Sequence, residues 1–253
     1  MDLGLANRVY VLTGASRGLG FATAQCLVAD GARVVISSRD EQRVADAVRR
    51  LGGDERAAGL AAELRDPATA QRLVRTAQER FGRLDGALIS VGGPPPGTAL
   101  AATDEQWRDS FETVFLGAVR AARTVAAALG AGGAIGFVLS SSVRVPIPGL
   151  GISNGLRPGL AGVAKDMAEE LAPRGIRVVS LLPGRILTDR IQELFAATGD
   201  AVRARAEAEA AIPMGRLGEP GEFGRVAAFL LSPAASYLTG LTVPVDGGAI
   251  HAL

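Results

Sequence analysis

A glycine-rich turn near the N-terminus has the residue types and the spacing to hold a phosphate group. Gly14, Gly18 and Gly20 form the pattern G-x-x-x-G-x-G between an apolar run at 9–12 and a helix-like stretch at 21–30. Glycine has no Cβ, so the backbone can approach a pyrophosphate closely, and the free N–H groups at the start of the helix face its negative charge. A glycine cluster can also serve only a tight turn, but the strand before it and the helix after it favour a dinucleotide site. The further candidate cofactor contacts within this turn are Ser16, Arg17 and Leu19.

The end of the second predicted strand indicates which dinucleotide this site prefers. The apolar run 33–36 leads into Ser38 and Arg39, about 20 residues beyond the turn, where an NAD site places an acid on the ribose hydroxyls. The first acid, Asp40, comes one position late. Ser38 and Arg39, together with Arg17, are typical of a pocket for a 2′-phosphate, although Arg39 can also simply begin a solvated helix. We therefore expect NADP(H) as the cofactor.

Strand-like and helix-like segments alternate along the whole chain and must position these residues. The predicted strands are 9–12, 33–36, 56–64, 84–90, 134–139, 176–182 and 241–245, and the predicted helices are 21–30, 40–51, 67–81, 104–129, 154–171, 185–211 and 219–231. This alternation predicts a single α/β domain over residues 1–253, with a doubly wound parallel sheet of the Rossmann type and helices on both faces. A TIM barrel has a similar length, but it leaves the glycine turn at the first strand unexplained. The charged helix at 185–211 is either a solvated face or a mobile cover for the site.

Composition excludes several classes of function. The 253 residues include 27 Lys and Arg against 26 Asp and Glu, so no net field favours nucleic acid or an anionic membrane. One cysteine, Cys26, and one histidine, His251, cannot by themselves form an internal disulfide or a metal site. No apolar run approaches the roughly 18 residues of a membrane span. We expect a cytoplasmic protein without a metal that acts on small molecules.

Taken together, these stretches resemble the short-chain dehydrogenase/reductase family over essentially the whole chain. The turn at 13–20 matches the cofactor signature of that family, Pro183-Gly184 with Thr188 resembles its nicotinamide-side motif, and 212–248 resembles its 3-oxoacyl carrier-protein reductases. The resemblance implies an NADP(H)-dependent oxidoreductase that acts on a carbonyl or alcohol such as a 3-oxoacyl thioester. It also implies a homotetramer. The further cofactor contacts that it implies are Glu63, Leu64, Val91, Gly92, Arg157, Pro183, Gly184, Ile186 and Thr188.

The catalytic positions of the family are altered in this chain. The family pattern is a Ser that binds the carbonyl, a Tyr that acts as general acid, a Lys four residues later and an Asn that supports a proton-relay water. Aligned on 170–176, Ser153 occupies the Tyr position and Arg157 the Lys position. Ser140, thirteen residues before Ser153, is the candidate serine, with Ser142 as the alternative if the loop has shortened. The relay Asn is replaced by Val114.

No other residue obviously supplies the missing acid. Tyr10 and Tyr237 are expected in the core, and Lys165 lies about 12 Å along the helix from Arg157 and is expected on the surface. Arg157 keeps a permanent cation that can stabilise a developing alkoxide, but it cannot release a proton at neutral pH. Two hypotheses remain open: an atypical oxidoreductase, with Ser140, Ser153 and Arg157 as candidate catalytic residues, and a binding protein that retains the nucleotide without turnover.

Overall fold

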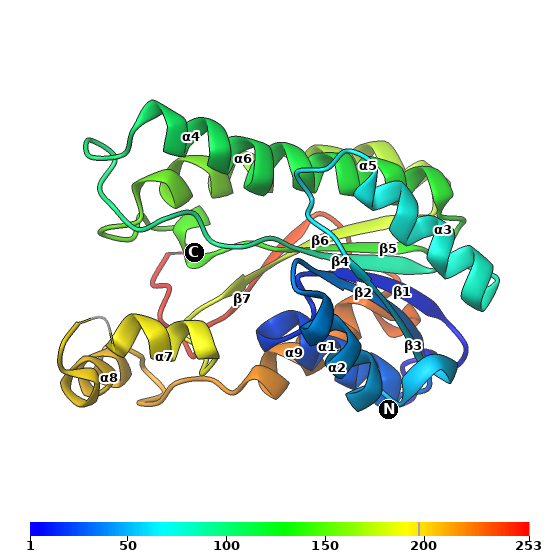
Figure 1. Cartoon of the computed structure of the whole chain (residues 1–253), viewed down its shortest axis with the longest axis horizontal. Coiled ribbons are helices and arrows are strands. Elements are labelled where there is room, and N and C mark those ends of the chain that lie inside the picture. The colour runs from blue at the N-terminus through cyan, green and yellow to red at the C-terminus, as the bar shows by residue number, and fades with distance from the viewer. Residues whose placement is uncertain (197, 253) are drawn as a thin grey trace.

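A single parallel sheet forms the centre of the molecule. The computed structural model describes residues 1–196 and 198–252, and within these residues seven strands are ordered β3-β2-β1-β4-β5-β6-β7 (Figure 1). The inner strands are buried on both faces, as apolar runs such as 9–12 require. The predicted doubly wound fold is confirmed. The strands are β1 (Val9–Thr13), β2 (Arg33–Ser38), β3 (Ala57–Ala61), β4 (Gly86–Ser90), β5 (Ala134–Val138), β6 (Arg177–Pro183) and β7 (Leu241–Val245).

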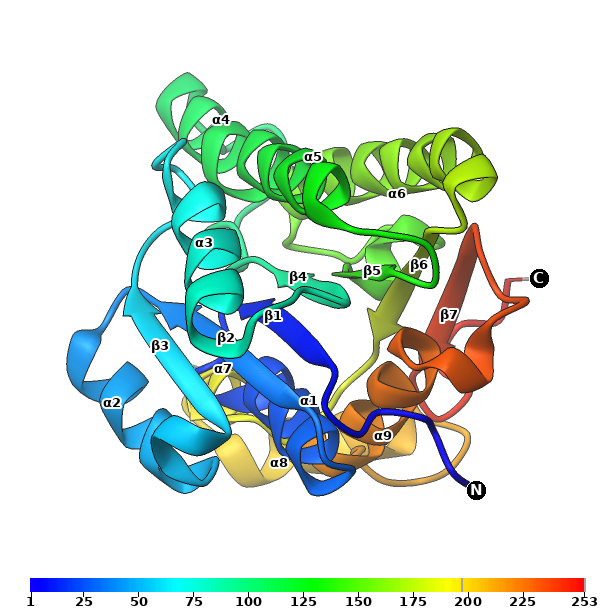
Figure 2. The same ribbon diagram turned by 90° about the vertical axis from the view of Figure 1, so that its right-hand side faces the viewer.

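Helices cover both faces of the sheet and enclose two apolar layers. Figures 1 and 2 show α1, α2 and α9 on one face and α3, α5 and α6 on the other. Leu27 and Phe223 belong to the layer under α1 and α9, and Leu73 and Leu160 belong to the layer under α3 and α6. The helices are α1 (Gly18–Ala29), α2 (Glu41–Arg50), α3 (Thr69–Phe81), α4 (Asp104–Ser110), α5 (Gly117–Ala128), α6 (Gly151–Leu171), α7 (Asp189–Ala196), α8 (Ala201–Ala210) and α9 (Pro220–Leu231).

The long helix predicted at 104–129 contains a change of helical geometry. A π-helical turn, Phe111–Leu116, separates α4 from α5. Gly117 follows this turn and lies so close to the main chain after β3 that a Cβ there would be 2.8 Å from the Leu64 carbonyl oxygen. Thr103 caps α4 through a capping box with Gln106.

The predicted helix 185–211 is wrong as a single element. Residues 185–188 are not helical, and two separate helices follow, α7 (Asp189–Ala196) and α8 (Ala201–Ala210). Gly199 has a positive φ of 84°, which ends the helical path, and the side chain of Asp200 accepts a hydrogen bond from the Arg203 N–H to begin α8. Figure 1 places both helices beyond the sheet, on the side of α1 and α9.

Other predicted boundaries and positions also need correction. The strand predicted at 56–64 ends at Ala61, and α6 begins at Gly151 rather than 154. Tyr10 is fully buried as expected, but Tyr237 is fully exposed just before β7, so its predicted core position is wrong. Among the residues that the structure describes, no helix has the length and apolar character needed to cross a membrane.

Candidate active site at the sheet's switch point

The candidate site lies where the strand order reverses, between β1 and β4. In open α/β sheets ligands bind beyond the carboxyl ends of the strands at this point. Thr13 holds the two strand ends together: its hydroxyl donates to the Ser90 carbonyl oxygen at 2.7 Å and accepts from the Ser90 N–H at 2.9 Å. The glycine turn after β1 and the loop at 91–97 after β4 therefore begin side by side.

The glycine turn has the geometry of an anion cradle. Gly14 and Gly18 have φ values of 60°, a backbone conformation that residues with a side chain rarely adopt. A Cβ at Gly20 would lie 2.8 Å from the Gly14 carbonyl oxygen, so only glycine fits between the turn and α1. The N-cap residue Arg17 makes no capping hydrogen bond, and the first turn of α1, which contains Leu19, has no acid. The N–H groups at the start of α1 are thus available to a pyrophosphate, and this turn fits the group.

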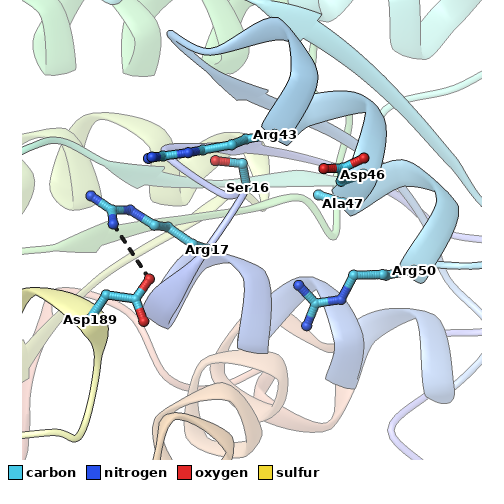
Figure 3. A pocket seen from close by; sticks show the side chains of 7 residues that line it. All are labelled: Ser16, Arg17, Arg43, Asp46, Ala47, Arg50 and Asp189. Atoms are coloured by element: carbon cyan, nitrogen blue, oxygen red, sulfur yellow. Dashed lines mark hydrogen bonds and ion pairs between the residues drawn. The ribbon is translucent and has the colours of Figure 1, made fainter.

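A cationic cavity adjoins this cradle. Figure 3 shows arginines from the turn and from α2 around this cavity. Its volume is about 260 Å³. Arg17 also forms ion pairs with two acids of α7, at 3.4 Å to Asp189 and 3.5 Å to Glu193. The residues lining the cavity are Ser16, Arg17, Arg43, Asp46, Ala47, Arg50 and Asp189.

Two of these arginines, Arg43 and Arg50, are not singled out by the sequence analysis. They lie seven residues apart on α2 and so share one helix face, which is the signal that could have identified them. Arg43 also pairs with Asp40 at 3.3 Å, and the Arg50 guanidinium lies 4.2 Å from the Phe21 ring centroid. The contact with Phe21 holds Arg50 near the start of α1, whereas the ion pair of Arg43 with Asp40 is local to the start of α2.

The other predicted adenosine contacts lie at the end of β2 and after β3. Arg39 has an 82% exposed side chain, and its Nε lies 3.8 Å from the Glu63 carboxylate. Ser38 ends β2, with its hydroxyl 3.5 Å from the Asp40 carbonyl oxygen. Leu64 follows Glu63 and packs against the core. The structure therefore brings Arg39 and Glu63 together, while neither lines the cavity of Arg43 and Arg50.

The nicotinamide-side motif faces the glycine turn. The β6 strand ends at Pro183, and a Cβ at Gly184 would lie 2.6 Å from Asp246 Cβ, so the chain passes close to the segment after β7. Ile186 is buried. Thr188 lies opposite Gly18, with its Cγ2 3.7 Å from the position that a Cβ on Gly18 would take.

The two candidate serines after β5 occupy different environments. Ser142 is buried, and its Oγ lies 3.4 Å from the Oγ of Ser153, the residue at the Tyr position. The Ser140 hydroxyl instead accepts a hydrogen bond from the Ser142 N–H at 3.1 Å and caps the short 3₁₀ turn Ser141–Val143. The geometry therefore favours Ser142, the alternative of the sequence analysis, as the partner of Ser153.

Arg157 lies behind these hydroxyls as a buried cation. It is 5% exposed and donates hydrogen bonds to the Val138 carbonyl oxygen at 2.9 Å and to the Gly92 carbonyl oxygen at 3.3 Å. Among the described residues its Nε has no hydrogen-bond partner, and no carboxylate lies within ion-pair distance. Burial lowers the pKa of Arg157 to about 10, so the side chain remains protonated at neutral pH. Val91 precedes Gly92 and packs against the core.

The relay position is apolar in this site. Val114 is 3% exposed and lies inside the π-helical turn between α4 and α5. Turns of this kind are frequent at functional sites, but a valine offers no hydrogen bond to a relay water. The neighbouring α6 is anchored by Asn154, whose amide bonds both the N–H and the carbonyl oxygen of Ile147.

Known proteins share this architecture throughout its length. A family profile described as enoyl-(acyl carrier protein) reductase matches residues 14–250. An uncharacterised oxidoreductase of Mycobacterium tuberculosis is 36% identical, with 96% of this chain and 92% of the relative covered. The structure of L-sorbose reductase from Gluconobacter frateurii complexed with NADPH and L-sorbose is 30% identical, with a TM-score of 0.91 and all of both chains covered. A short-chain oxidoreductase from Pseudomonas aeruginosa, described as containing an atypical catalytic center, is 28% identical, with a TM-score of 0.90 and all of both chains covered. The chain therefore belongs to the short-chain dehydrogenase/reductase family and is an oxidoreductase of that type.

Proposed function

We propose that this chain is an NADP(H)-dependent oxidoreductase that reduces a carbonyl compound or oxidises the matching alcohol. The observation that carries the cofactor preference is the cavity in which Arg17, Arg43 and Arg50 surround the start of α1. Guanidinium groups bind phosphate through charge-assisted, often bidentate hydrogen bonds. The NADPH in the related L-sorbose reductase structure supports the same choice.

Calorimetric titration of both cofactors tests this preference. Charge-assisted contacts to the 2′-phosphate contribute roughly 1.5 to 3 kcal/mol, so NADPH should bind about ten- to a hundredfold more tightly than NADH. Arg43→Ala should reduce this ratio, and Arg39→Ala tests the residue that the sequence analysis proposed. Arg75→Ala, an exposed arginine on α3, is the matched control and should leave the ratio unchanged. Equal affinities of the wild type for the two cofactors would contradict the assignment.

The chemistry that we propose uses the buried hydroxyl pair. When bound, NADPH supplies the hydride. Ser142 and Ser153 hold the substrate carbonyl oxygen by hydrogen bonds, and the Arg157 cation stabilises the negative charge that develops on it. Water supplies the proton, because none of these three groups releases one at neutral pH. A 3-oxoacyl thioester is a candidate substrate, in keeping with the resemblance to 3-oxoacyl carrier-protein reductases.

The environment of Arg157 also supports a second candidate function. Two of the Arg157 nitrogen atoms donate to main-chain carbonyl groups, and Val114 gives no relay, so the site also suits a protein that binds NADPH and senses it without turnover. NADPH oxidation against a panel of ketones and 3-oxoacyl thioesters distinguishes the two. Measurable turnover by the wild type is required if the protein is an enzyme.

Alanine variants test which of the two serines, Ser140 or Ser142, binds the substrate carbonyl. Ser142→Ala should lower kcat more than it weakens NADPH binding, whereas Ser140→Ala should have the smaller effect on kcat, because Ser140 caps a turn. If only Ser140→Ala abolishes turnover, Ser142 is not the carbonyl-binding residue. A wild type that binds NADPH, reduces nothing in the panel and gains activity in the double variant Ser153→Tyr, Arg157→Lys would favour the binding protein.

A further inference from the structure

The loops around the candidate substrate site carry an excess of positive charge. Residues 91–98, after β4, contain no charged side chain. The loops after β5 and β6, with the start of α7, contain one acid, Asp189, which pairs with Arg17 at 3.4 Å on the cofactor side. The charged residues of these two segments are Arg144, Arg185, Asp189 and Arg190.

Arg190 connects α7 with the loop after β4. Its Nη2 lies 3.2 Å from the position that a Cβ on Gly93 would take, so the guanidinium rests against the main chain of that loop. Gly93 directly follows Gly92, whose carbonyl oxygen accepts from Arg157. The exposed guanidinium of Arg190 and the buried guanidinium of Arg157 therefore lie next to adjacent residues of the same short loop.

Neither arginine is neutralised by the protein. Both acids of α7, Asp189 and Glu193, pair with Arg17. Within the described part of the chain, no carboxylate lies within 4.0 Å of the side-chain nitrogen atoms of Arg190 or Arg157, and the Arg157 Nε has no hydrogen-bond partner. For the buried Arg157, a cation without a counter-ion is costly, and an anionic ligand bound nearby offsets that cost. Arg190 is exposed and is not desolvated, so its guanidinium is available to pair with an anion.

We infer that the substrate is an anionic carbonyl compound, an oxo-carboxylate, whose carboxylate is held by Arg190 at the mouth of the site beside Ser142 and Ser153. A planar guanidinium matches a carboxylate with two parallel hydrogen bonds, which orients the substrate as well as binding it. Arg157 lies deeper and faces the carbonyl end of the molecule. This inference rests on the proposed oxidoreductase function and narrows its substrate class.

Binding of a matched ligand pair to the protein saturated with NADP+ tests the inference without turnover. Calorimetry compares 3-hydroxybutyrate with its neutral isostere 3-hydroxybutyramide. The carboxylate should bind about tenfold or more tightly than the amide, and Arg190→Gln should remove that difference while NADPH affinity stays unchanged. Arg123→Gln, an exposed arginine on α5 that has no ion pair among the described residues, is the control and should keep the difference.

The following binding results would decide against the inference. Equal affinities of the two ligands, or binding of neither, would overturn it. A loss of NADPH affinity in Arg190→Gln would assign the arginine to the cofactor instead. Failure of the proposed function looks different, because carboxylate-selective binding without reduction of acetoacetate would contradict the oxidoreductase and leave the anion site standing. Reduction of neutral ketones with no preference for acetoacetate over methyl acetoacetate would support the oxidoreductase and contradict the anion site.

Discussion

Two buried arginines, Arg157 and Arg177, allow a matched test of whether Arg157 is present for stability or for chemistry. They are 5% and 7% exposed. Arg177 donates to three carbonyl oxygens at and beyond the end of α9: Leu230 at 2.7 Å, Ser232 at 2.8 Å and Leu238 at 3.3 Å. Arg157 donates to two carbonyl oxygens, and its Nε has no hydrogen-bond partner among the residues that the structure describes. The same substitution, Arg→Met, removes the charge at both positions while keeping an apolar chain.

The expected losses of stability differ. Each hydrogen bond from a charged group contributes about 1.5 to 3 kcal/mol, so Arg157→Met removes about 3 to 6 kcal/mol. Burial lowers the pKa of Arg157 to about 10, and relief of that desolvation returns roughly 3 kcal/mol. The net loss in the free energy of unfolding of Arg157→Met is therefore about 0 to 3 kcal/mol. Arg177→Met removes three such bonds and a cation that interacts with the end of a helix, which contributes up to about 2 kcal/mol, so we expect a larger cost of at least about 3 kcal/mol.

Urea unfolding followed by circular dichroism, at one fixed protein concentration, measures both costs. NADPH oxidation measured on the same samples should show that Arg157→Met abolishes turnover, while the folded fraction of Arg177→Met retains it. The reasoning is refuted if Arg157→Met destabilises the protein as much as Arg177→Met does, or if it leaves kcat intact. Either result would make Arg157 a structural residue.

Three further predictions concern the cradle, α9 and assembly. Gly20→Ala places a Cβ 2.8 Å from the Gly14 carbonyl oxygen, so NADPH affinity measured by calorimetry should fall by about tenfold or more. The hydrogen bonds from Arg216 and then from the Glu219 N–H lower the pKa of Glu222 from 4.5 to about 2, so its stabilising contribution is present above pH 4.5 and is lost as the pH falls toward 2. Melting temperatures between pH 5 and 2.5 should therefore fall more in the wild type than in Glu222→Gln. Light scattering should give a homotetramer, and a monomer near 26 kDa at micromolar concentration would contradict that expectation.

The sequence by itself determined the fold and the cofactor cradle. Apolar runs such as 9–12 and 33–36 could be recognised as strands because buried parallel strands need continuous apolar residues. The turn from Gly14 to Gly20 could be recognised because its glycines are required by local backbone geometry, which the order of residues reports directly.

Features that depend on contacts between distant segments were decided only by the tertiary structure. The loop before α6 positions Ser142 rather than Ser140 opposite Ser153, and residue counting along the chain could not establish that contact. Tyr237 has the aromatic character of a core residue, yet it precedes the edge strand β7 and remains exposed. Arg190 meets Gly93 although 97 residues separate them, because α7 folds back onto the loop after β4. Periodicity and turn chemistry act over a few residues, whereas the distance between side chains on separate elements is set by how those elements pack.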